Sequence, residues 1–144
     1  MRLFPQDVKV SALGRVPLFS GLSKKELAQL ARMSDDVEVE PGHVLCHEGR
    51  TGREFFVIVE GDVEVTRKGR RVKRSGGDDF FGEIALLEDI PRTATVTAKT
   101  PLRLFVLTRQ DFRRLLEASP TVEKKVMQSL ARRLLALSND PALG

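Results

Sequence analysis

The chain has 144 residues, of which 41% are hydrophobic and 31% are charged. This length fits a single domain over residues 1–144, and the balance is typical of a globular protein rather than a disordered or membrane-spanning one. The net charge of +4 favours an anionic partner. A single cysteine excludes an internal disulfide, and the N-terminus lacks the apolar core of a signal peptide. We therefore expect a cytoplasmic protein that contacts no membrane.

The first 33 residues contain helix signals. Ser23 and Glu26 form a capping-box pattern, in which each side chain bonds the backbone N–H of the other residue. Leu27 and Leu30 follow at helical spacing. The sequence therefore predicts N-terminal helices over residues 1–33.

From residue 35 to residue 108 the hydrophobic period changes from that of a helix to that of a strand. Val37 and Val39 alternate with acidic residues, and glycines separate further short apolar runs. The segment "RLFVL" at 103–107 is the last of these runs. Many short strands separated by turns are typical of an antiparallel sandwich or roll.

Residues 109–138 are predicted to form two C-terminal helices. In the second of them, Ser119 occupies the N-cap and Pro120 the first helical position. Together with the central strands, these helices indicate an α+β fold. Apolar residues recur along one face of the last helix: Val122, Val126, Leu130, Leu134 and Leu137.

The segment "FFGEIALLEDIPRTATVTA" at 80–98 places Arg92 among small and apolar residues. A poorly solvated guanidinium needs an anionic partner, and its planar fork matches phosphate. Gly82 precedes a predicted short helix whose free N–H groups favour an anion, whereas Glu83 suits a group that donates hydrogen bonds, such as a sugar hydroxyl. A nucleotide carries both groups. The alternative is that Glu83 and Arg92 pair with each other across a turn.

This segment resembles the phosphate-binding cassette of cyclic nucleotide-binding domains, with "FGEIAL" at 81–86 and "RTATVTA" at 92–98 as the matching residues. The segment "LCHEGRTGREFFVIVEG" at 45–61 resembles a second pattern of that family. The resemblance implies an eight-stranded antiparallel β-roll, or jelly roll, that carries the cassette at 81–98, with N-terminal helices, a short cassette helix and two C-terminal helices. It also implies that Arg92 binds the cyclic phosphate and Glu83 the ribose 2′-hydroxyl. The candidate ligand-binding residues of the cassette are Phe81, Gly82, Glu83, Ile84, Ala85, Arg92, Thr93 and Ala94.

The resemblance also concerns the base and the closure of the site. We expect cAMP as the ligand, although a hydroxyl residue after the arginine, here Thr93, can contact the guanine amino group of cGMP. The final helix resembles the lid of the family, in which Arg132 or Arg133 would stack on the purine, or Leu134 or Leu135 would cover it. The alternative is that these arginines point into solvent and the leucines pack on the roll.

Other chemistry is not expected from this sequence. His43 and His47 would lie roughly 13 Å apart on a strand, and Cys46 would face the other way, so no metal site is predicted. No carboxylate pair or nucleophile–histidine spacing indicates an enzyme. The basic run "RKGRRVKR" at 67–74 predicts a solvated hairpin. Contact with nucleic acid or anionic lipid is the alternative, but no aromatic residue is interleaved to stack on bases.

The sequence therefore predicts a regulatory domain for signal transduction that binds cAMP or cGMP and responds through its C-terminal helix. The same helix is the candidate surface for a homodimer, and the domain itself is expected to contact no nucleic acid. One alternative is the ligand-sensing part of a catabolite activator-type transcriptional regulator, or of a channel or kinase, with an unknown effector. Another is a roll that has lost its ligand and serves as an interaction module.

Overall fold

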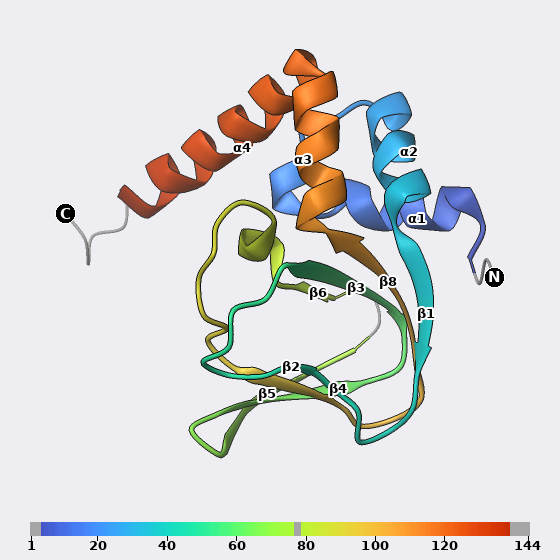
Figure 1. Ribbon diagram of the computed structural model, residues 1–144, viewed down its shortest axis with the longest axis vertical. Helices are drawn as coiled ribbons and strands as arrows, with labels where there is room; N and C mark the ends of the chain where they lie inside the picture. The colour runs from blue at the N-terminus through green and yellow to red at the C-terminus, as the bar shows by residue number, and fades with distance from the viewer. Residues whose placement is uncertain (1–3, 77–78, 139–144) are drawn as a thin grey trace.

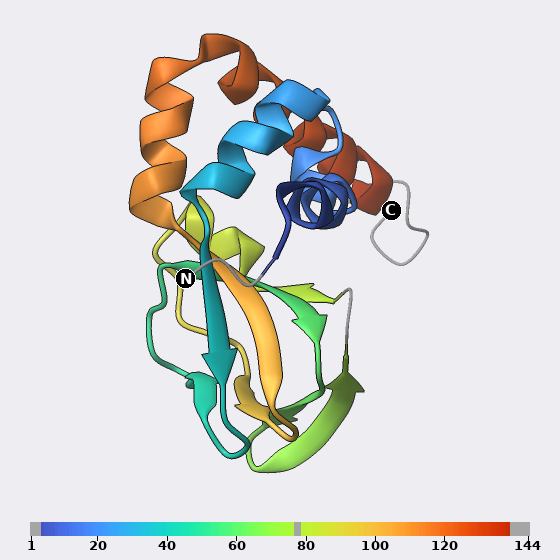
Figure 2. The same cartoon turned by 90° about the vertical axis from the view of Figure 1, so that its right-hand side faces the viewer.

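The computed structural model describes residues 4–76 and 79–138, and its helices gather at one end of a β-roll (Figures 1 and 2). Of the helices in these ranges, none combines the length and the hydropathy that crossing a bilayer requires. The helices are α1 (Gln6–Gly14), the 3₁₀ helix η1 (Pro17–Phe19), α2 (Lys24–Met33), the 3₁₀ helix η2 (Glu83–Leu86), α3 (Arg109–Ala118) and α4 (Pro120–Ser138). The strands are β1 (Asp35–Val39), β2 (Val44–Cys46), β3 (Glu54–Glu60), β4 (Val63–Arg67), β5 (Arg70–Ser75), β6 (Phe80–Phe81), β7 (Thr95–Ala98) and β8 (Leu102–Thr108).

The strands form two four-stranded sheets that face each other (Figure 2). One sheet has the order β1-β8-β3-β6 and the other β2-β7-β4-β5, and every strand pairing is antiparallel. This arrangement confirms the predicted α+β fold with an eight-stranded antiparallel roll. The roll brings β6 and η2, which belong to the cassette, close to the hairpin formed by β4 and β5.

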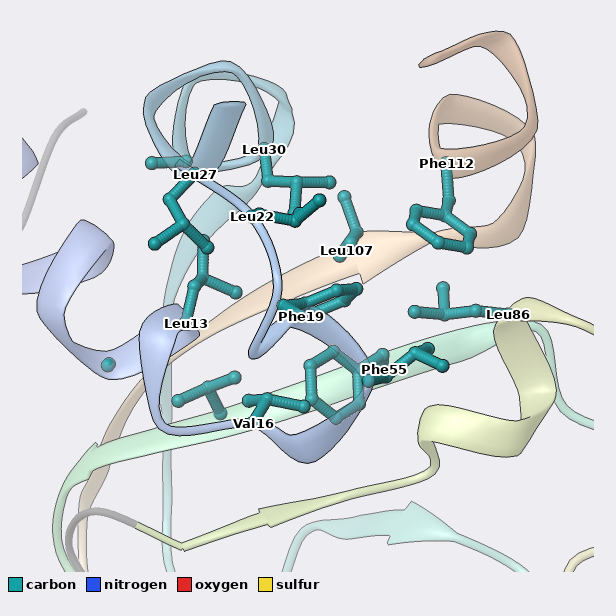
Figure 3. Close-up of a cluster of buried hydrophobic side chains, with 14 of the residues drawn as sticks. Leu13, Val16, Phe19, Leu22, Leu27, Leu30, Phe55, Leu86, Leu107 and Phe112 are labelled. Atoms are coloured by element: carbon teal, nitrogen blue, oxygen red, sulfur yellow. The ribbon is translucent and has the colours of Figure 1, made fainter. Parts of the chain in front are cut away.

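Strand β3 separates two hydrophobic cores because its side chains alternate between the two faces of the sheet. Phe55 and Val57 face the helices, where they join the larger core with residues of α1, α2, α3 and α4 (Figure 3). Phe56 and Ile58 face the opposite sheet and form the interior of the roll. Burial on both faces explains why this strand is a continuous apolar run rather than an alternating one.

A cap at the start of α2 and an aromatic cluster contribute to the helical layer. Ser23 Oγ accepts the Glu26 N–H at 3.2 Å and Glu26 Oε1 accepts the Ser23 N–H at 2.8 Å, which is the capping box that the sequence predicts. The Phe19 ring lies 6.0 Å from the ring of Phe55 and 5.7 Å from that of Phe112, measured between centroids (Figure 3). Phe19 therefore joins the roll to α3.

The apolar stripe predicted for the last helix is buried only in its first half. Val122 and Val126 belong to the larger core, and Leu130 packs against it. Leu134 is 65% exposed, and the side chain of Leu137 lies outside the described residues. The difference arises because α4 runs outward from the helical layer, so its second half has no core beneath it (Figure 1).

We predict that Phe19→Ala lowers the free energy of unfolding by about 3–5 kcal/mol, because it removes a fully buried aromatic ring and leaves a cavity between three elements. Urea unfolding followed by circular dichroism measures the change. Met127→Ala, which truncates an exposed side chain on α4, is the control and should shift stability by less than about 0.5 kcal/mol. Equal stabilities of the Phe19→Ala and wild-type proteins would contradict this packing.

Candidate functional site

The cassette residues surround a cavity of about 470 Å³ beside η2. Its volume lies within the range of small-molecule sites in proteins, and most of its walls are apolar. The β4–β5 hairpin supplies Val65, Arg67 and Val72 to the opposite wall. All eight cassette residues that were singled out from the sequence line this cavity: Phe81, Gly82, Glu83, Ile84, Ala85, Arg92, Thr93 and Ala94.

Arg92 is held in the cavity by a carbonyl group rather than by a carboxylate. Its Nη2 donates to the Glu54 carbonyl oxygen at 2.7 Å, and its guanidinium carbon lies 5.9 Å from the centre of the Phe56 ring. Within residues 4–76 and 79–138, no carboxylate forms an ion pair with Arg92, so the pairing with Glu83 considered above is not found. The charge of this half-buried guanidinium is therefore oriented by the protein but not neutralised.

Two glycines make room for the Arg92 guanidinium. Gly82 has a φ of +87°, and a Cβ atom there would lie 2.8 Å from the Glu54 carbonyl oxygen. At Gly52 a Cβ atom would overlap the Arg92 guanidinium itself. Side chains at these two positions are excluded by backbone conformation in the first case and by the arginine in the second.

Helix η2 follows its N-cap residue Gly82 and presents one side to the cavity. Glu83 and Ala85 are buried, and Ile84 is exposed at the cavity mouth. The Ala85 N–H donates to the Gly82 carbonyl at 3.0 Å, which closes the first turn. On the inner side, Leu86 packs into the larger core, so η2 is anchored to the helical layer (Figure 3).

Arg67 is a cavity residue that the sequence did not single out. It was counted only as part of the basic run, yet its Nε donates to the Thr93 carbonyl at 3.1 Å. The register of β4 with β7, which pairs Thr66 with Thr95, brings it there. Local sequence contains no signal for this approach, because the pairing joins segments almost thirty residues apart. The residues around the hairpin turn, 68–72, are exposed, as predicted for a solvated turn.

The candidate lid residues whose side chains the structure describes do not line the cavity. Arg132, Leu134 and Leu135 are exposed on the second half of α4, and the side chain of Arg133 lies outside the described residues. The structure therefore brings the cassette residues together but not the cassette with the end of α4 (Figure 1). The lid stays a prediction.

The cavity also contains the Cys46 thiol, whose side chain is buried. Burial raises the pKa of this thiol to about 11, and the nearby Arg92 charge acts in the opposite direction. The thiol is therefore protonated and unreactive near neutral pH. In the described part of the chain, no group of three or more His, Cys, Asp and Glu side chains is placed to hold a metal ion.

Comparisons with known proteins agree with this geometry. Residues 36–119 match the family described as "Cyclic nucleotide-binding domain". A putative potassium channel protein of Rhodopseudomonas palustris is 38% identical over 125 residues, covering 84% of this chain and 30% of the channel protein. A cAMP-dependent protein kinase regulatory subunit of Yarrowia lipolytica is 43% identical over 106 residues, covering 72% of this chain and 28% of the subunit. The chain thus spans less than a third of these relatives.

A solved structure shares the fold over nearly its whole length. The N-terminal domain of a transcriptional regulator from Streptomyces coelicolor superposes with a TM-score of 0.81 at 34% identity, covering 90% of this chain and 96% of that one. The chain belongs to the cyclic nucleotide-binding domain family. The resemblance seen in the cassette is thereby confirmed at the level of the family.

We predict that Gly52→Ala displaces the Arg92 guanidinium while changing the fold little, because the backbone at Gly52 lies outside the left-handed region. The Nε–H signal of Arg92 in two-dimensional NMR spectra, assigned with Arg92→Lys, should shift as the guanidinium moves and the bond from Nη2 to the Glu54 carbonyl is lost. Gly14→Ala is the control, since its Cβ would meet only a flexible Leu27 methyl at 3.4 Å. An Arg92 signal at the wild-type position in Gly52→Ala would refute this contact.

A second prediction concerns alkaline stability. The unfolded chain loses the Cys46 proton from about pH 9.0, whereas the folded protein retains it to about pH 11. The free energy of unfolding should therefore fall as pH rises through this window, and Cys46→Ala should remove part of the slope. Urea unfolding from pH 8 to pH 10 measures this pH dependence of the free energy of unfolding. The chain lacks tyrosine, so no phenol titrates in the same range. Identical slopes for both proteins would show that the thiol is not protected.

Proposed function

We propose that this domain is a sensor that binds a 3′,5′-cyclic purine nucleotide in the cavity beside η2. The observation that carries the proposal is the Arg92 guanidinium, which faces the cavity with a carbonyl as its hydrogen-bond partner and, among the described residues, no carboxylate to neutralise it. A cyclic phosphate supplies the missing negative charge in a geometry that the guanidinium fork matches.

The other walls suit the remaining parts of such a ligand. Glu83 is buried on the cavity side of η2 and accepts hydrogen bonds, so we assign it to the ribose 2′-hydroxyl. Val65 and Val72 on the hairpin and Ile84 on η2 provide the apolar surface that a purine needs. Phosphate, sugar and base then extend from Arg92 towards the hairpin.

Two observations point to different bases for the ligand, adenine or guanine. The kinase regulatory subunits among the relatives are named as cAMP-dependent, which favours cAMP. Thr93 lies at the cavity with its hydroxyl available for the guanine amino group, which favours cGMP. We propose cAMP as the preferred ligand, with cGMP as the competitor to be measured beside it. We propose that the domain binds its ligand without catalysing a reaction. We also place it in the cytoplasm, where a free thiol such as Cys46 stays reduced.

The response to the ligand is assigned to α4. Met127, Leu134 and Leu135 are large apolar side chains exposed along this helix. They can cover the base as a lid, or pack against a second copy of the chain. Since the chain covers less than a third of its curated relatives, we propose that it acts as the sensing part of a longer regulator, channel or kinase.

Calorimetry with cAMP and cGMP tests the binding proposal. The wild type should bind one or both nucleotides, and Arg92→Ala should weaken binding by at least about 30-fold, because losing one partner of a hydrogen-bonded charge pair costs about 2–5 kcal/mol. Arg70→Ala, which removes an exposed arginine of the hairpin, is the matched control and should bind like the wild type. No binding by the wild type, or equal affinities of wild type and Arg92→Ala, would refute the proposal.

A further inference from the structure

A second arginine, Arg109, lies on the far side of η2 from the cavity. It is the first residue of α3, directly after the N-cap residue Thr108, and it is only 4% exposed. A buried guanidinium keeps its charge, so its hydrogen-bond donors must find partners within the protein. The hydrogen-bond partners of its guanidinium in the described part of the chain belong to one short segment, residues 85–89.

The Arg109 guanidinium binds the end of η2 and the turn that follows. Its Nε donates to the Ala85 carbonyl at 2.6 Å and its Nη2 donates to the Glu88 carbonyl at 2.6 Å. Its Nη1 donates to the Asp89 carboxylate. Carbonyl groups at the C-terminal end of a helix lack partners within that helix, and here the Arg109 side chain satisfies one such group, that of Ala85, together with the Glu88 carbonyl of the following turn.

The two carbonyl bonds are the stronger part of this contact. The Asp89 carboxylate is half exposed and is shared with Arg53, whose Nε lies 3.5 Å from it, so solvent screens the ion pair. The hydrogen bond from Arg109 nevertheless holds the pKa of Asp89 below its usual value. The Arg109 N–H also donates to the Arg53 carbonyl at 2.9 Å, which ties the start of α3 to the residue before β3.

Ala85 connects this contact to the cavity. One side of Ala85 lines the cavity, and its carbonyl oxygen accepts from Arg109 on the other side. Glu83 lies in the same turn of η2. Ala85 therefore links the Arg109 side chain directly to the residues that line the cavity.

We propose that Arg109 is a positioning residue of the binding site, which holds η2 in the orientation that the ligand requires and makes ligand affinity depend on the position of α3. This inference rests on the proposed function. Because coupling between two sites is reciprocal, ligand binding also strengthens the attachment of α3 to the cassette.

The test compares nucleotide affinities of folded variants by calorimetry. Arg109→Met keeps the apolar stem and removes every donor, and it should weaken cAMP binding at least tenfold. Arg109→Lys, whose single ammonium cannot bind both carbonyls and the carboxylate, should show an intermediate loss. Arg113→Met is the matched control, because Arg113 is exposed one turn later on α3, and it should leave affinity unchanged. Thermal unfolding identifies the temperature range in which each variant is folded.

A second ligand separates positioning from a general loss of structure. The nucleotide 2′-deoxy-cAMP lacks the hydroxyl assigned to Glu83, so the wild type should prefer cAMP over it. If Arg109 holds Glu83 in place through η2, this preference should shrink in both Arg109 variants. A purely structural role leaves the preference unchanged.

The outcomes distinguish this inference from the function on which it rests. A wild type that binds no cyclic nucleotide overturns both. A wild type that binds cAMP, together with a folded Arg109→Met or Arg109→Lys that keeps its affinity and its preference, overturns the positioning role alone. If Arg109→Met does not fold, the milder Arg109→Lys decides the question by the same two measurements.

Discussion

The Arg92 guanidinium is held by the carbonyl oxygen of Glu54, and the geometry of the whole site depends on this contact. A neutral acceptor orients the planar fork without cancelling its charge, so the cavity retains a positive centre at one wall. Gly52 and Gly82 are required because any side chain there would occupy the space of the guanidinium or clash with the carbonyl that holds it. The Glu54 carbonyl thus orients the Arg92 guanidinium, and the space that the guanidinium occupies requires glycine at positions 52 and 82.

The two arginines beside η2 differ in how their charges are satisfied. Arg109 is almost fully buried and binds two carbonyls and a carboxylate, so its role within the protein is complete. Arg92 is half-buried and faces the cavity, and within the described ranges its side chain has one hydrogen-bond partner, a carbonyl. A guanidinium whose three nitrogens all bind the protein fixes structure, whereas one that faces a cavity is available to a ligand. Helix η2 lies between the two arginines. Arg109 binds its C-terminal end, and its cavity side lies beside Arg92.

The sequence predicted short strands, the cap of α2 and the cassette segment because these signals lie in residues close together in the chain, whereas the eight-stranded roll, which pairs distant segments, followed from the family resemblance. The run Phe55–Ile58 identified a strand, but not that both of its faces are buried, which follows from its place between the helices and the second sheet. Arg67 and Arg109 were not predicted at the cassette, since β-sheet register and the β8–α3 junction bring them there. The stripe on α4 was predicted as continuous, but the helix extends past the core after Leu130.

A crystal structure of the protein grown with cAMP tests the central claim most directly. The account predicts phosphate oxygens within hydrogen-bond distance of the Arg92 guanidinium, with the ribose beside Glu83 and the Glu54 carbonyl still bound to Arg92. A structure in which the nucleotide lies elsewhere, or in which Arg92 turns into bulk water while the ligand occupies the cavity, would contradict it.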